Sequence, residues 1–179
     1  GAGANLGTIE EPLLRQQVWA SLWEMVRDQQ LSSLEYLAAI RSVLPEERSL
    51  PIVQMVTATA LGAVARYVPD HKIEAEASAM VAAARAAIDS APEGDLRVLW
   101  ARALVGLVTT AEDAQIAAAL IDDPPSGLAI DQNLRWSVAM RWVGLGLEGA
   151  GKRLAAERAR DASDRGDRAM AQAEAATPD

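Results

Sequence analysis

The chain has 179 residues, half of them apolar, which is enough for one domain with a substantial core and argues against general disorder. Lys and Arg total 17 against 25 Asp and Glu, and the resulting net charge of −8 disfavours binding to nucleic acid. The absence of cysteine excludes disulfides, thiol nucleophiles and cysteine-ligated metal sites.

The apolar residues are mainly Ala, Leu and Val, and the chain has no Phe. Because Ala and Leu favour helices whereas strands draw on aromatic and β-branched residues, we predict an all-α fold. No apolar run approaches the length needed to span a bilayer, so we expect no membrane partner. The lack of cysteine suits a reducing compartment, and we expect a cytoplasmic location.

The N-terminal residues 1–10 begin with GAGANLG, which lacks the basic and apolar parts of a signal peptide. We expect this segment to be a linker or tag remnant, and the missing initiator Met leads us to expect a fragment of a longer protein. Residues 11–179 are predicted to form a single α-helical domain, because no linker longer than about eight residues separates the predicted helices.

The first four helices are marked by local signals. Pro12 suits the first turn of a helix, and apolar residues follow it at spacings of three and four. Ser32 and Glu35 form a capping-box pattern at the start of the second helix, which Pro45 ends. A third helix is predicted over residues 49–67, and a long Ala-rich fourth helix opens near Asp70.

The second half of the chain continues the pattern. A fifth helix covers DLRVLWARALVGLV, and Thr110 is expected to cap the sixth. Asp131 or Asn133 is expected to cap the seventh, which covers NLRWSVAMRWVGLG. The polar stretch from GKRLAAERARD onward predicts one or two further helices at an exposed end of the domain.

A Leu-Arg pair recurs at helical positions of the sequence. Leu96 and Leu134 lie 38 residues apart, whereas Leu14 and Leu96 lie 82 apart, with the third helix midway between them. Four helices thus recur about every 40 residues, each followed by a second helix. This period predicts a HEAT or armadillo-like stack of antiparallel helix pairs that forms a curved superhelix.

No motif for catalysis or metal binding is present. The single histidine, His71, lies in PDHKIE, and we interpret it as a solvated turn residue. The stretch GLGLEGAGK follows a predicted helix and lacks the spacing of a phosphate-binding loop. We therefore predict no catalytic residue, no metal ligand and no cofactor in this chain.

Tryptophan and arginine supply the candidate site residues. Trp19, Trp23, Trp100 and Trp136 lie among aliphatic residues at helical spacing. We expect them to pack in the core or between repeats, although an aromatic lining of a groove is the alternative.

Arginines that lie near these tryptophans, on the same predicted helices, have two interpretations. They can pair with acidic residues or free helix carbonyls, or they can face a peptide carboxylate or a neighbouring domain. The candidates for a peptide-facing or domain-facing role are Arg97, Arg135 and Arg141.

Several stretches resemble the C-terminal helical domain of bacterial M1-family zinc aminopeptidases of the aminopeptidase N type. They are EPLLRQQVWASLWEMVRD, LSSLEYLAAIRSVLPEE, DLRVLWARALVGLVTTAEDAQIAAALID, GLAIDQNLRWSVAMRWVGLG and AERARDASDRGDRAMAQAEAATP. The corresponding region is similar to the C-terminal domain of endoplasmic-reticulum aminopeptidases. The most specific parts are the first helix with Arg15 and Trp19, and the segment from Asp131 to Trp136.

The resemblance implies a non-catalytic domain that covers the active-site chamber of a peptidase and limits the access of peptides. The family's zinc lies in a separate domain that carries HExxH and a GAMEN-type loop, and neither motif occurs here. The implied partners are that catalytic domain of the same parent chain and the peptide substrate. Zinc is implied only for the parent's catalytic domain.

Two alternatives use the same helical architecture. The first is a free-standing HEAT-like scaffold that binds a protein or peptide, since fold alone does not fix function. The second is a ligand-binding helical bundle with one closed apolar pocket.

Overall fold

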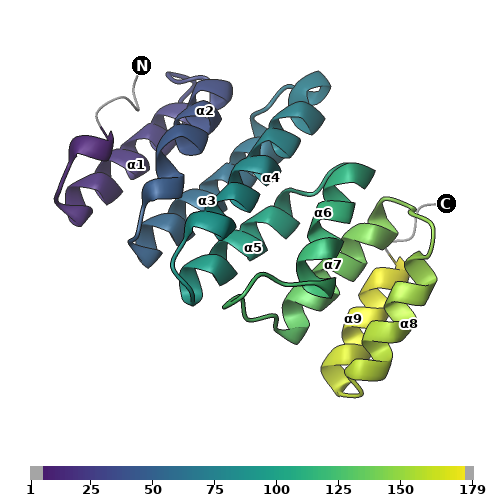
Figure 1. Cartoon of the computed structure of the whole chain (residues 1–179). Helices are drawn as coiled ribbons and strands as arrows, with labels where there is room; N and C mark the ends of the chain where they lie inside the picture. The colour runs from purple at the N-terminus through teal and green to yellow at the C-terminus, as the bar shows by residue number, and fades with distance from the viewer. Residues whose placement is uncertain (1–5, 176–179) are drawn as a thin grey trace.

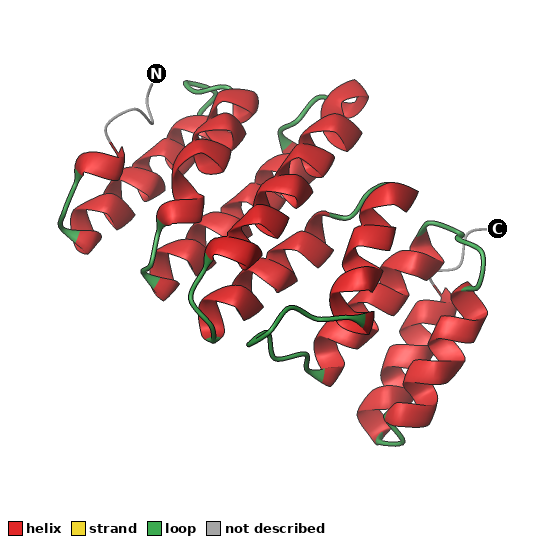
Figure 2. Ribbon diagram, viewed as in Figure 1, coloured by secondary structure: helices red, strands yellow, loops and turns green. Residues whose placement is uncertain are grey.

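The structure, a computed structural model, describes residues 6–175, and every regular element among them is a helix (Figure 2). The all-α prediction is therefore confirmed. Three short 3-10 helices cover Leu6–Thr8, Leu44–Glu46 and Asp70–Lys72. The α-helices of this region are α1 (Pro12–Arg27), α2 (Ser33–Val43), α3 (Leu50–Arg66), α4 (Ile73–Ser90), α5 (Asp95–Leu107), α6 (Ala111–Asp122), α7 (Gln132–Gly144), α8 (Ala150–Arg160) and α9 (Asp164–Ala175).

The helices are stacked in the order of the chain, from α1 and α2 at one end to α8 and α9 at the other (Figure 1). Each helix packs against the next, and each odd-numbered helix also packs against the following odd-numbered one from α1 to α9. On the other side, α2 packs against α4. These contacts join the odd-numbered helices into one continuous row, against which the even-numbered helices pack. The HEAT or armadillo-like repeat stack stays a prediction. The curvature of a superhelix stays a prediction.

Side-chain caps begin several helices where the sequence places them. The Ser32 hydroxyl accepts a hydrogen bond from the Leu34 N–H, and the Thr110 hydroxyl accepts one from the Asp113 N–H. An Asp131 carboxylate oxygen accepts from the Leu134 N–H at 2.8 Å, which selects Asp131 over Asn133 as the cap of α7. Such caps satisfy backbone donors that the first helical turn leaves unpaired.

Residues just before α1 pack with the domain. Leu6, which lies in the segment expected to be a linker or tag remnant, is 1% exposed and belongs to the main hydrophobic core. Ile9 packs against the same core. At least residues 6–10 therefore lie against the helical stack.

Two hydrophobic clusters stabilise the stack, and α7 contributes to both. The main cluster draws on buried residues from α1 to α7 and includes Trp19 and Trp100, each 1% exposed. A smaller cluster includes Trp136 of α7, Leu154 of α8 and Ala173 of α9. Because one helix supplies residues to both clusters, α8 and α9 are anchored to the rest of the domain through α7.

The other two tryptophans are half-buried. Trp23 lies between two tyrosines, with ring centroids 5.8 Å from Tyr36 and 5.5 Å from Tyr67. The Arg153 guanidinium lies 4.8 Å from the centroid of the Trp142 ring, within the range of a cation–π contact. The four tryptophans expected to pack thus lie in or against the core.

The α8–α9 pair gives a prediction about close packing. A Cβ atom at Gly166 of α9 would lie 2.1 Å from the backbone oxygen of Asp161, too close for any real contact. We expect Gly166→Ala to lower the free energy of unfolding by about 2 kcal/mol, because the backbone before α9 has to move. Urea unfolding followed by circular dichroism measures this loss.

Gly151 of α8 provides the matched control, since a Cβ atom there would meet no other atom within 4 Å. Alanine favours helix over glycine, so Gly151→Ala should leave stability equal or raise it by up to about 1 kcal/mol. Equal effects of the two substitutions would contradict the described contact between Gly166 and Asp161.

Candidate functional site

Arg97, near the start of α5, donates hydrogen bonds to backbone carbonyl groups. Its Nε donates to the Ala91 oxygen at 2.9 Å, just after the end of α4, and its Nη1 donates to the Ser126 oxygen. These bonds join the α4–α5 turn to the loop between α6 and α7. Arg97 thus satisfies the carbonyl group of the residue that caps α4 and one carbonyl group of the α6–α7 loop.

Arg135 of α7 has a comparable environment. Its Nη2 donates to the Ile121 oxygen in the last turn of α6 at 3.4 Å, and its Nη1 lies 3.8 Å from a carboxylate oxygen of Glu157 in α8. Glu157 is only 4% exposed and also accepts a hydrogen bond from Gln132. Arg135 therefore neutralises the buried Glu157 carboxylate and links α7 to α6 and α8.

Arg141 differs from these two arginines because it lines an open groove. Its Nη2 donates to the Gly106 oxygen at the end of α5 at 2.7 Å, which leaves the remaining N–H groups of the guanidinium available. The side chain keeps solvent contact, yet burial lowers the pKa of its guanidinium. Of the three candidate arginines, Arg141 is the one that lines this groove.

The groove beside Arg141 lies between α5 and α7 and has a volume of about 790 Å³. We call it the α5–α7 groove; its apolar lining includes Val105, Val108, Met140 and Leu145. Its polar lining includes Arg102, which forms a 2.7 Å ion pair with Asp131. This volume lies within the range of pockets that bind small ligands.

A second groove of about 630 Å³ adjoins the first, and it lies between α7 and α9. Asn133, Ser137 and Met140 line both grooves, so they form a shared ridge along α7. The α9 side of this α7–α9 groove carries Arg165 and Arg168.

No sequence motif singles out Arg165 or Arg168. Their spacing of three residues predicts one shared helix face, but it does not reveal that this face lies beside α7.

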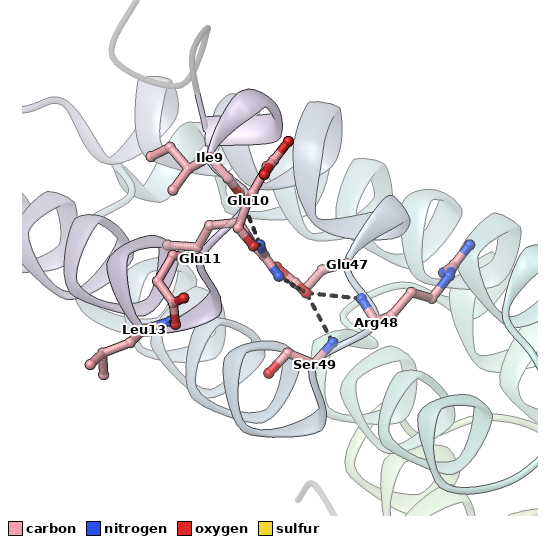
Figure 3. Close-up of polar contacts among 8 residues, drawn as sticks. Ile9, Glu10, Glu11, Leu13, Glu47, Arg48 and Ser49 are labelled. Carbon is pink, nitrogen blue, oxygen red and sulfur yellow. Dashed lines mark hydrogen bonds and ion pairs between the residues drawn. The ribbon is translucent and has the colours of Figure 1, made fainter.

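A polar cluster at the other end of the stack joins α1 to the turn before α3 (Figure 3). Arg15 Nε and Nη2 donate to the two carboxylate oxygens of Glu47 at 2.7 and 2.9 Å, and Nη1 donates to the Ile9 and Glu10 oxygens. Glu47 also accepts hydrogen bonds from the backbone N–H groups of Arg48 and Ser49. Residues 9–10 are thereby held by Arg15 of α1, which Glu47 links to the turn before α3.

The Glu47 carboxylate is stabilised in its charged form. Burial alone would raise its pKa, but hydrogen bonds from Arg15, Ser49 and Arg48 outweigh that effect and lower it. The hydrogen bond and charge of Glu47 in turn raise the pKa of Arg15 against the opposing effect of burial. Both carboxylate oxygens of Glu47 and all three nitrogen atoms of the Arg15 guanidinium form hydrogen bonds within the domain, so we assign this cluster a structural role.

The described residues contain neither a metal-binding cluster nor a membrane-spanning helix. Within residues 6–175, no three His, Asp or Glu side chains gather in a way that could hold a metal ion. In the same range, no helix is both long and apolar enough to cross a bilayer.

Comparison with known proteins gives two matches. The profile of the family described as ERAP1-like C-terminal domain matches residues 2–179. A protein of Streptomyces lividans named Aminopeptidase N is 34% identical to this chain over 177 residues. The alignment covers 97% of this chain and 20% of that protein, so the chain spans about a fifth of its relative's length.

Proposed function

Because the chain belongs to the family of ERAP1-like C-terminal domains, we propose that it is the non-catalytic lid of an aminopeptidase that removes N-terminal residues from peptides. In this proposal the helical stack covers the active-site chamber and limits which peptides enter. The observation that carries the proposal is the alignment of 97% of this chain with part of Aminopeptidase N.

The residues of this chain do not fit a zinc site. It has one histidine and no cysteine, and zinc sites in enzymes draw mainly on several such ligands. We therefore assign zinc, and with it the hydrolysis of the peptide bond, to the remainder of an M1-type parent protein. This chain supplies the helical stack that covers the active-site chamber. Its closure over the chamber would exclude water and long peptides from the reacting groups.

The proposed partners are the catalytic part of the parent and its peptide substrate. A cytoplasmic location is part of the same proposal, supported by the absence of cysteine from the sequence.

Reconstitution tests the proposed partnership with the catalytic part. This chain and the remainder of the parent, produced separately, are expected to form a one-to-one complex in analytical ultracentrifugation. We expect the remainder to cleave an amino-acid p-nitroanilide and this chain alone to leave it intact. Failure to form a complex, or release of p-nitroaniline by this chain alone, would refute the proposal.

A further inference from the structure

The α5–α7 and α7–α9 grooves form one surface with an unusual charge. They share the α7 ridge of Asn133, Ser137 and Met140, and α7 packs against both α5 and α9. Within the described part of the chain, the lining of the two grooves contains four arginines and no aspartate or glutamate. This cationic surface belongs to a chain with a net charge of −8.

Among the described residues, three of the four arginines form no ion pair with a carboxylate. Arg102 pairs with Asp131, whereas no ion pair within residues 6–175 involves Arg141, Arg165 or Arg168. Most other arginines of this region are paired with acidic residues, including those at positions 15, 27, 41 and 153. Unpaired guanidinium groups along a groove favour an anionic ligand, which they can bind through charge-assisted hydrogen bonds.

The shape of the surface favours an extended ligand over a compact ion. Helices that pack together lie about 8–10 Å apart, so a ligand that crosses α5, α7 and α9 spans roughly 18 Å. An extended peptide of about six residues has this length. The α5–α7 groove offers the apolar side chains of Val105, Val108 and Leu145, while Asn133, Ser137 and Gln172 offer hydrogen bonds to a peptide backbone.

From this combination, we propose that the two grooves bind an extended peptide segment that carries acidic side chains between apolar ones. Arg141 receives a carboxylate on one side of the α7 ridge, and Arg165 and Arg168 receive another on the other side. We assign the segment to the downstream part of the peptide substrate, an assignment that rests on the proposed function. The aminopeptidase would then favour peptides with acidic residues beyond the cleaved end.

Fluorescence anisotropy with the 179-residue chain tests this binding directly. The probe is a fluorescein-labelled peptide of about six residues in which leucine alternates with glutamate, and the comparison peptide has glutamine in place of glutamate. We expect the glutamate peptide to bind about tenfold more tightly, with an affinity that falls as salt is raised. Equal binding of the two peptides, or no detectable binding of the glutamate peptide, would overturn the proposal.

Substitutions locate the binding surface. Arg141→Gln, and Arg165→Gln combined with Arg168→Gln, should each weaken binding of the glutamate peptide by about five- to tenfold. Arg66→Gln is the matched control, because Arg66 is exposed at the end of α3 and lies outside both grooves. If the groove variants bind as tightly as the control, the peptide lies elsewhere and the proposal is wrong.

A steric variant tests the same surface without changing its charge. Gly144 lines the α5–α7 groove, and a Cβ atom there would meet no other atom within 4 Å. A leucine Cβ atom is therefore accommodated at this position, and we expect Gly144→Leu to occupy part of the groove and weaken peptide binding. Unchanged binding would contradict the placement of the peptide in the groove.

Two measurements together separate this proposal from the lid function: complex formation with the catalytic remainder, and binding of the glutamate and glutamine peptides. If the chain forms a complex with the catalytic remainder but does not distinguish the two peptides, only the acidic-peptide assignment fails. If the groove variants lose the complex with the remainder while the glutamate peptide does not bind, the surface is an interface between domains and the peptide proposal is overturned. Peptide binding without complex formation instead contradicts the lid function and the assignment of the segment to the substrate, while the binding of acidic peptides in the grooves stands.

Discussion

Trp19→Ala is expected to lower the free energy of unfolding by about 4 kcal/mol. The Trp19 side chain is 1% exposed, and its ring meets Tyr36 of α2 edge-on with the ring centroids 6.0 Å apart. Truncation removes this contact and leaves a cavity between α1 and α2. Because most domains have only about 5–15 kcal/mol of stability, urea unfolding should show a clear fall in the midpoint.

Trp23→Ala is the matched control on the same helix. Trp23 contacts Tyr36 and Tyr67 but is only half-buried, so we expect a smaller loss of about 2 kcal/mol. A loss for Trp23→Ala equal to or greater than that for Trp19→Ala would show that the core is packed differently.

Glu47→Ala is expected to lower the free energy of unfolding at neutral pH by about 3 kcal/mol. The carboxylate accepts hydrogen bonds from Arg15 and from two backbone N–H groups, and its side chain is 7% exposed. Its removal leaves the Arg15 guanidinium, 18% exposed, without an anion. Chemical denaturation at neutral pH measures the loss.

The pH dependence gives a second measurement on Glu47. Because folding lowers the pKa of Glu47, its charge stabilises the folded state above the unfolded value of about 4.5, and this contribution is lost as pH falls through the lower folded pKa. The stability difference between the wild-type chain and Glu47→Ala should therefore shrink below about pH 4.5. A constant difference across this range would contradict the charged cluster.

Glu24→Ala controls for the loss of any surface carboxylate. Glu24 pairs with Arg27 on the exposed face of α1, where both side chains are more than half exposed. Such surface pairs contribute little, so the expected change is within about 0.5 kcal/mol. A loss comparable to that of Glu47→Ala would mean that burial is not the reason for the effect of Glu47.

The order of helices could be predicted from the sequence because its signals are local. Ser32, Thr110 and Asp131 each cap the helix that immediately follows, so a short window of sequence contains both donor and acceptor. The start of α4 is not marked by such a local signal. Asp70, where the sequence predicts the helix to begin, opens a 3-10 turn, and the α-helix begins at Ile73. The exact residue at which such a helix begins depends on how its first turn packs.

The arginine contacts could not be predicted from the sequence in the same way. Arg15 and Glu47 are 32 residues apart, and Arg141 and Gly106 are 35 residues apart, so each contact depends on how neighbouring helices are placed. The alternative in which arginines bind carbonyl groups at helix ends describes Arg97, Arg135 and Arg141 in the structure. A peptide-facing role for Arg141 stays a prediction, now supported by its groove.

The most direct test of the lid function compares the parent aminopeptidase with and without this domain. The measured quantity is the ratio of kcat/KM for long peptides to kcat/KM for dipeptides with the same N-terminal residue. If the helical stack covers the chamber, removing it raises this ratio by opening the chamber to long peptides. An unchanged ratio, with both forms folded and active, would contradict the lid function and favour a separate peptide-binding scaffold.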